Sequence, residues 1–238
     1  MGRLATLRVQ LRALASPATA LVLQRFFKTG PGDYGEGDVF LGIKVPPLRA
    51  LAKQHRDADL ATVAALLDSP YHEERLFALL LLMQFFQAAD DAGQQAAFEL
   101  YLGNTRHINN WDLVDISAPH IVGRQLQHRS RAVLDTLAHS PSLWERRIAI
   151  VATLHFIRHN DFDCTLRLAR ILLHDTHDLM HKAVGWMLRE VGKRDRAVLE
   201  AFLQQHHRQM PRTMLRYAIE RFEPAVRKRY LHGKNGPG

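Results

Sequence analysis

The chain has 238 residues, of which 47% are hydrophobic and 24% are charged. This balance is that of a soluble globular protein with a core, and it excludes a fibre or a wholly disordered chain. The single cysteine, Cys164, excludes an intramolecular disulfide and any metal site built on cysteines, which fits a reducing cytosol. Because this length is near the upper limit for one core, we expect one domain over residues 1–231 and a flexible tail over 232–238.

Helical periodicity runs along most of the chain. Apolar residues recur at intervals of three and four, turn signals separate the segments, and no segment alternates as a strand does. Asp59, Ser130 and Ser142 are side chains able to cap helix N-termini, as is Asp161. Pro211 stands where a missing N–H donor costs nothing. The predicted helices span about 4–15, 18–28, 47–56, 59–68, 72–88, 93–103, 111–126, 130–138, 142–158, 162–173, 178–193, 195–207, 211–221 and 224–231.

The first predicted helix has some features of a targeting peptide. Residues 1–32 contain no acidic residue, and Leu4, Leu7 and Leu11 form part of one apolar stripe. The stripe continues into the next segment without a break that resembles a cleavage site. We therefore expect an ordinary first helix in an unprocessed, cytoplasmic protein.

A loop rich in glycine separates the second and third predicted helices, at residues 29–42. It lacks the Lys-Ser/Thr pair of a P-loop, and no strand precedes it, so we expect no nucleotide cofactor. Two hypotheses remain open for this segment. It is either a flexible connector or a loop whose backbone N–H groups lie against phosphates, in which case Tyr34 is one of the expected contacts.

The starts of four strongly apolar predicted helices recur at a constant spacing. Arg75, Trp111, Arg147 and Ala183 are each 36 residues apart, and each lies near the start of such a helix. A two-helix repeat slightly shorter than the usual ~40 residues predicts an all-α, HEAT-like helical-repeat solenoid, with a globular helical bundle as the alternative. In a solenoid, residues one period apart become neighbours on one face.

The charge is unevenly distributed along the chain. The net charge is +8, but residues 1–119 carry 11 Lys or Arg against 13 Asp or Glu, whereas residues 120–238 carry 21 against 11. Such a positive field points to a polyanionic partner, although it also serves solubility. No apolar run reaches the roughly 20 residues that span a bilayer, so nucleic acid is favoured over a membrane. We expect a concave basic groove.

Asp115 is the most informative single position. It interrupts an apolar helical stretch between Leu113 and Val122, where an isolated buried carboxylate would be costly. It therefore either has a partner, for which Arg147 is a candidate, or faces a groove. One hypothesis is a structural salt bridge between repeats. The other is a carboxylate that stabilises a cationic transition state or orients a water molecule.

Trp111 and Trp186 are either core anchors or platforms for a ligand. Trp186 follows Gly185, and a glycine inside a helix costs about 1 kcal/mol unless a close approach requires it. An indole in a positive groove suits a cation or a stacked base. His177 and His181 share a helix face, but no clear third ligand and no metalloprotease glutamate accompany them, so we expect no metal.

Four ordered blocks of this sequence resemble a known family. They are Gly-Glu-Gly-Asp-Val-Phe-Leu-Gly-Ile-Lys-Val-Pro at 35–46, Trp-Asp-Leu-Val-Asp at 111–115, Trp-Glu-Arg-Arg-Ile-Ala-Ile at 144–150 and Lys-Ala-Val-Gly-Trp-Met-Leu-Arg-Glu at 182–190. Over about residues 20–230 the chain resembles the AlkD-type DNA alkylation repair family. The resemblance implies a HEAT-like solenoid that hydrolyses the N-glycosidic bond of N3- or N7-alkylated purines in duplex DNA.

The same resemblance implies roles for particular residues. In that family a Trp-x-x-x-Asp helix supplies the catalytic aspartate, two tryptophans flank the lesion, and an arginine contacts the DNA backbone; these fall on Asp115, Trp111, Trp186 and Arg147. Further DNA contacts are expected at Lys182, Arg189 and Tyr34. We expect a monofunctional, monomeric glycosylase that needs no cofactor, metal, membrane or obligatory protein partner and joins the nucleoid when bound to DNA.

A non-catalytic helical-repeat scaffold is the alternative function. Many helical solenoids bind intact DNA or a protein on their concave face. Asp115 discriminates between the two functions, because a surface that only binds phosphates gains nothing from a lone carboxylate.

Overall fold

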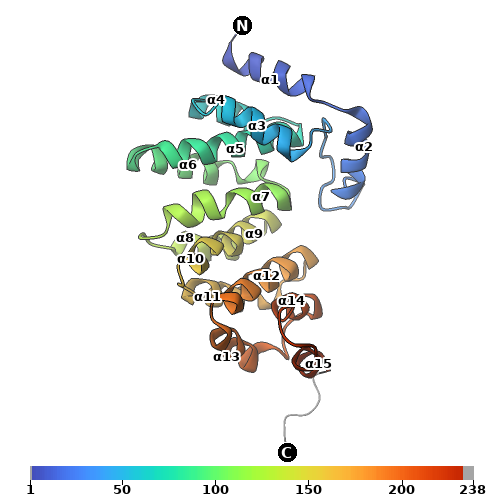
Figure 1. The fold of residues 1–238 in the computed structure, drawn as a ribbon, viewed down its shortest axis with the longest axis vertical. Coiled ribbons are helices and arrows are strands. Elements are labelled where there is room, and N and C mark those ends of the chain that lie inside the picture. The colour runs from blue at the N-terminus through green and yellow to red at the C-terminus, as the bar shows by residue number, and fades with distance from the viewer. Residues whose placement is uncertain (1, 233–238) are drawn as a thin grey trace, which may run out of the picture. The chain divides into compact units, whose positions relative to one another are not determined.

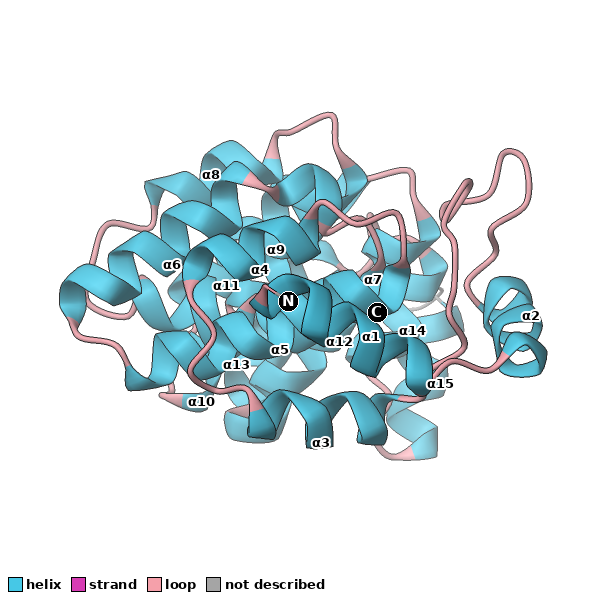
Figure 2. Cartoon of the chain, turned by 90° about the horizontal axis from the view of Figure 1, so that it is seen from above, coloured by secondary structure: helices cyan, strands magenta, loops and turns pink. Residues whose placement is uncertain are grey.

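The computed structural model describes residues 2–232 of the chain. These residues form helices and loops, and Figure 2 accordingly contains no strand colour; Val39 and Tyr71 make one isolated β-bridge. The chain forms two compact units, Met1–Ser117 and Ala118–Gly238. The all-α prediction is confirmed. The single domain over 1–231 stays a prediction, and of the predicted tail at 232–238 only residue 232, the end of the last helix, lies within the described residues.

In the first unit, α5 is the central helix. It packs against α3, α4, α6 and α7, and the side chains from Leu76 to Leu82 are all buried. Figure 1 shows these helices in blue to green, and α2 is labelled at the right of Figure 2. The elements are α1 (Arg3–Ala13), α2 (Pro17–Phe26), α3 (Val45–Gln54), α4 (Leu60–Leu67), α5 (His72–Ala88), α6 (Asp91–Gly103), the 3-10 turn η1 (Thr105–His107) and α7 (Trp111–Ser117).

In the second unit, α12 is the central helix. It packs against α9, α10, α11, α13 and α14, and its apolar face is buried. The elements are η2 (Pro119–Gly123), α8 (Ala132–Ala138), α9 (Leu143–Ala152), α10 (Leu154–Arg158), α11 (Asp163–Ile171), η3 (Leu172–His174), α12 (Asp178–Arg194), α13 (Arg196–His206), α14 (Arg212–Ala218) and α15 (Pro224–His232).

The 36-residue period falls on equivalent places in the helices. Arg75, Trp111, Arg147 and Ala183 all lie within the first two turns of α5, α7, α9 and α12, respectively. Apolar helices that recur at this spacing, each preceded by a less apolar one, are the pattern of a helical repeat. The concave basic groove stays a prediction.

Two predicted helices are divided in the structure. The predicted helix 111–126 ends at Ser117, because Pro119 has no N–H to continue the ladder, and the backbone widens into one π turn in which Gly123 N donates to Ala118 O at 2.9 Å. The predicted helix 142–158 is divided at Thr153, whose hydroxyl donates to the carbonyl of Ile150 at 2.6 Å.

The helix caps follow the sequence in part. Asp59 accepts a hydrogen bond from Thr62 N at 2.7 Å, and Ser142 caps α9 as expected. Ser130 stands one residue before the N-cap of α8. The prediction that Asp161 caps α11 is wrong, because the helix begins at Asp163 with Phe162 as its N-cap, and the carboxylate of Asp161 instead lies 2.6 Å from Arg131.

Gly185 permits a close approach of two helices in the second unit. A Cβ at this position would lie 2.5 Å from the carbonyl oxygen of Met214 and 2.6 Å from the Cβ of Tyr217, so any larger residue would push α14 away from α12. The cost of a glycine in a helix interior is therefore offset by packing. The close approach that the sequence suggested is confirmed.

Candidate functional site

Trp111 begins α7 and lies against aromatic rings from the end of α2. Its ring stacks on Phe27 with ring centres 5.3 Å apart and meets Phe26 edge-on at 6.0 Å. Its backbone N–H donates to the side chain of Asn110 at 2.8 Å. Phe27 in turn stacks on Phe40 at 5.2 Å. The indole is therefore half-buried, held by these aromatic contacts, with part of its surface exposed.

Asp115 follows Trp111 by four residues, so the two side chains share one face of α7. Asp115 is only partly buried. Burial raises the pKa of Tyr101 far above its usual range and the negative charge of Asp115 adds to the rise, while the hydrogen bond to Ser117 opposes it. The carboxylate thus lies near the buried hydroxyl of Tyr101, and the residue as a whole is partly exposed.

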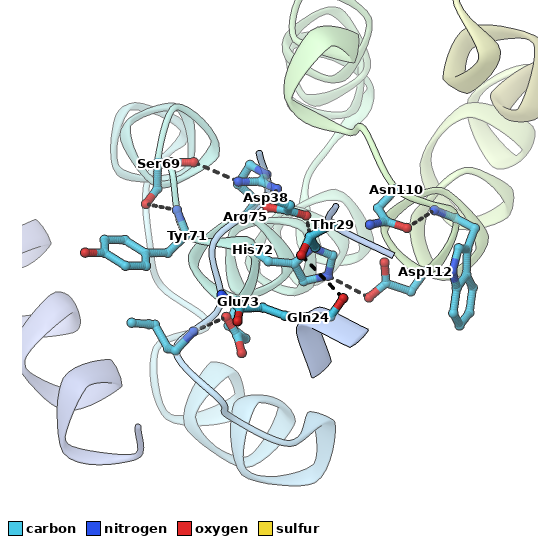
Figure 3. A network of polar contacts seen from close by, with 12 residues as sticks. Gln24, Thr29, Asp38, Ser69, Tyr71, His72, Glu73, Arg75, Asn110 and Asp112 are labelled. Carbon is cyan, nitrogen blue, oxygen red and sulfur yellow. Dashed lines mark hydrogen bonds and ion pairs between the residues drawn. The ribbon is translucent and has the colours of Figure 1, made fainter. Parts of the chain in front are cut away.

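The start of α5 carries four consecutive buried residues that are charged or titratable. They are His72, Glu73, Glu74 and Arg75, and none is more than 4% exposed. Together they reach the Gly-rich loop, α1 and α7, and Figure 3 shows the part of this network around His72. Sequence reasoning used Arg75 only as a repeat marker and missed the others. The available signal was a run of four polar residues joined directly to a wholly apolar stretch.

His72 bridges two carboxylates from distant segments. Its Nδ1 lies 2.7 Å from Asp38 in the Gly-rich loop, and its Nε2 lies 2.8 Å from Asp112 at the start of α7. Its ring stacks on Phe40 at 4.5 Å. Burial by itself lowers the pKa of His72, but the hydrogen bonds and charges of Asp112 and Asp38 outweigh it and raise the pKa to about 9. The imidazole is therefore charged at neutral pH.

Asp38 is a buried anion held by two cations. Besides His72, its carboxylate binds Arg75 at 2.6 Å, and the same guanidinium donates to the carbonyl of Ser69 at 3.0 Å. Burial raises the pKa of Asp38, but the hydrogen bonds and charges of His72 and Arg75 lower it below its ordinary value. The loop is thereby tied to α5.

Glu73 holds the end of the Gly-rich loop. Its two carboxylate oxygens accept hydrogen bonds from the backbone N–H groups of Leu41, Gly42 and Ile43 at 2.8, 2.8 and 3.0 Å. Gly42 has a φ of +81°, and a Cβ there would collide with the carbonyl of Ser16. Both hypotheses for the loop are therefore wrong at this end: it is fixed, and its amides bind the protein's own carboxylate instead of phosphate. Tyr34 stays a predicted contact.

The titration of His72 predicts a loss of stability at alkaline pH. Because its folded pKa of about 9 is above the ordinary 6.5, its contribution is fully present below pH 6.5 and is lost as the pH rises through 9. The free energy of unfolding, measured in urea between pH 6.5 and 9.5, should fall more steeply for the wild type than for His72→Gln. Parallel curves for the two proteins would contradict this prediction.

The remaining predicted site residues lie in the second unit. Arg147 on α9 is buried, and it donates to the carbonyl of Leu179 at 2.6 Å, which fixes the start of α12. On α12, Trp186 is half-buried and its Nε1 donates to Glu190 at 3.1 Å. Lys182 pairs with Asp178 at 2.7 Å, and Arg189 pairs with Glu190 and Glu220. These cations thus have partners within their own unit.

The histidines at the start of α12 serve the local backbone. His177 Nδ1 accepts a hydrogen bond from Leu179 N at 3.1 Å, and His181 Nε2 lies 2.5 Å from the carbonyl of Asp175. Within residues 2–232, no three His, Cys, Asp or Glu side chains gather in a way that would hold a metal ion. No helix among these residues has the length and apolar character needed to cross a membrane.

Comparisons with known proteins identify the family and a structure with the same fold. The family model described as "DNA alkylation repair enzyme" matches residues 7–222, and the chain therefore belongs to that family. A solved structure described as "Predicted DNA alkylation repair enzyme from Enterococcus faecalis" shares the fold with a TM-score of 0.68 and 19% identity, over 88% of this chain and 97% of that one. Among curated proteins, none matches the chain. The resemblance carried by the four sequence blocks is confirmed, and it assigns the protein to DNA repair.

Proposed function

We propose that this protein is a monofunctional DNA glycosylase that hydrolyses the N-glycosidic bond of N3- or N7-alkylated purines in duplex DNA. The observation that carries the proposal is the pairing of Trp111 and Asp115 on one face of α7, with both side chains partly exposed. Membership of the family makes DNA the substrate. A ring for a base and a carboxylate one turn away are the two groups that this hydrolysis needs.

The chemistry requires little from the protein. A purine alkylated at N3 or N7 carries a positive charge, so it leaves as a neutral base without being protonated. The bond from C1′ to the base breaks with its electron pair going to the base, and the sugar develops the character of an oxocarbenium ion. Water then adds its oxygen to C1′ and gives up a proton, leaving a free alkylpurine and an abasic sugar. The only charge that needs new stabilisation is on the sugar.

Each predicted residue has a role in this reaction. The carboxylate of Asp115 stabilises the positive sugar and orients the attacking water. Trp111 and Trp186 hold the cationic nucleotide by stacking and cation–π contact. The proposed contacts to the DNA backbone are Lys182, Arg189 and Tyr34. Arg147 is the arginine that the resemblance assigns to the same role, and it would have to leave its buried position against the carbonyl of Leu179 to reach a phosphate. The pair Lys182–Asp178 is exposed and worth at most about 1 kcal/mol, so a phosphate can displace Asp178.

Release of free base tests the proposal directly. Duplex DNA containing N7-methylguanine is incubated with the protein in the presence of a chelator, and the free base and abasic sites are quantified. We expect both products in equal amounts without strand cleavage, because no metal, cofactor or second catalytic function is proposed. DNA binding without base release would favour the non-catalytic scaffold. Activity that disappears in chelator and returns with zinc would favour a metal enzyme and direct attention to His177 and His181.

A further inference from the structure

We propose that His72 is a positioning residue for this reaction: the imidazolium that bridges Asp38 and Asp112 holds the start of α7, and so sets the orientation of Trp111 and Asp115. The kinetic part of the inference rests on the proposed function. Its structural part rests on contacts within the first unit alone.

Asp112 connects the bridge to the proposed site. It directly follows Trp111 in the chain, and its side chain is 18% exposed. Among the described residues, His72 provides the one hydrogen bond that we find to its carboxylate; the other oxygen, Oδ1, is buried and accepts none. The helix it belongs to has only seven residues, and a helix of that length depends on tertiary contacts for its order. The place of this carboxylate, and with it the first turn of α7, therefore depends on His72.

His72 also supports Trp111 through an aromatic contact. The ring of Phe27 has its centre 5.0 Å from that of His72 and 5.3 Å from that of Trp111, so Phe27 contacts both rings. A polar route through Asp112 and an apolar route through Phe27 thus lead from the same imidazole to Trp111. Two independent contacts restrain the indole more than either would alone.

The bridge requires a charged imidazole. A neutral imidazole has one N–H donor, so it could donate to Asp38 or to Asp112 but not to both, whereas the imidazolium donates from both nitrogens. A buried carboxylate left without its donor is strongly unfavourable. The charged groups that face the imidazole are Asp38 from the loop and Asp112 from α7, and Arg75 on its own helix binds the same Asp38. The raised pKa of His72 agrees with this arrangement.

Glu74 provides a matched control on the same helix. Its buried carboxylate binds Arg8 and Arg12 of α1, each at 3.1 Å. It is as buried as His72, and its ion pairs lead away from α7 to another helix. Removal of its charge therefore measures what the loss of a buried ion pair at the start of α5 does by itself.

The experiment compares His72→Gln with Glu74→Gln. Three quantities are measured in conditions where each variant is folded: DNA affinity, single-turnover base release at saturating protein, and the resonance of the Trp111 indole N–H in a ¹H–¹⁵N spectrum. For His72→Gln we expect base release to fall by about tenfold or more through misplacement of the site, with DNA affinity little changed and the Trp111 resonance shifted. Glu74→Gln should leave the rate and the resonance as in the wild type. Equal effects of the two variants would reduce His72 to a structural residue and overturn the inference.

A second variant tests whether the effect travels through Asp112. In a double-mutant cycle, His72→Gln combined with Asp112→Asn should lower base release no further than His72→Gln alone, because the loss of His72 already breaks the link through Asp112. Losses that multiply would overturn the inference. If His72→Gln does not fold, Asp112→Asn, at the more exposed end of the bridge, should still shift the Trp111 resonance and lower the rate of base release, because it breaks the polar route. If the wild type releases no base at all, the proposed function fails, whereas the Trp111 resonance still decides the role of His72.

Discussion

Asp115→Asn should lower single-turnover release of an alkylated base by roughly a hundredfold or more, the loss typical of a removed electrostatic stabiliser. The amide keeps the shape of the side chain but loses the negative charge, which interacts most strongly with a sugar that becomes positive only as the bond breaks. DNA binding should persist and can tighten slightly, because a repulsion between the carboxylate and the phosphates disappears. Filter binding and single-turnover product analysis on the same preparation give both quantities.

The free energy of unfolding and the cleavage rate of the folded fraction, both measured on Asp115→Asn, separate a catalytic role of Asp115 from a structural one. If Asp115 were half of a structural ion pair, Asp115→Asn would lose several kcal/mol of stability, as a broken buried pair does. Its folded fraction would then cleave at the wild-type rate, which would contradict the catalytic role. Glu99→Gln is the matched control, because it removes one exposed negative charge from α6 in the same unit. It should leave base release unchanged.

Glu73→Gln should produce a large loss of stability in the first unit. The carboxylate accepts hydrogen bonds from three buried backbone amides, and the amide of glutamine presents an N–H₂ group where one of the accepting oxygens stood. A buried donor without an acceptor costs about 1–3 kcal/mol, and more when the lost acceptor was charged, so we expect roughly 3 kcal/mol. Urea denaturation followed by circular dichroism measures the difference.

Glu36→Gln is the control for Glu73→Gln. Glu36 also accepts a hydrogen bond from a backbone amide of the Gly-rich loop, that of Gly32 at 2.9 Å, but it is exposed, so water can replace the lost acceptor. The expected loss is within about 1 kcal/mol. Similar losses in the two variants would show that the buried position of Glu73 is not what stabilises the loop.

Local patterns account for what the sequence predicted well. The apolar periodicity placed the helices, and Asp59 and Ser142 cap theirs because a cap depends only on residues three positions away. The error at Asp161 is one of position, since α11 begins two residues later, at Asp163, and Asp161 pairs with Arg131. Pro119 is the exception, since its missing N–H was visible in the sequence and divided a helix that the periodicity had joined.

In the candidate site, too, local motifs could be read from the sequence, whereas contacts between distant residues could not. Trp111, Asp115 and Trp186 could be proposed from the sequence because their motifs are contiguous, and they stay predictions; the close packing at Gly185 followed from the cost of glycine in a helix. The partners of His72 and Glu73 were not, because they lie between 30 and 40 residues away. A sequence shows that such residues are charged, whereas the fold decides which partner each one meets.

The run of buried charges at the start of α5 has a consequence for how the first unit comes apart. In a simple helical array each repeat contacts only its neighbours, so the ends can fray while the middle stays folded. Here one helical turn is bonded to α1 through Glu74, to the Gly-rich loop through Glu73, and to α7 through His72. If any one of these segments opens, a buried charged side chain at the start of α5 loses its partner. The first unit should therefore unfold as one cooperative block instead of peeling away helix by helix.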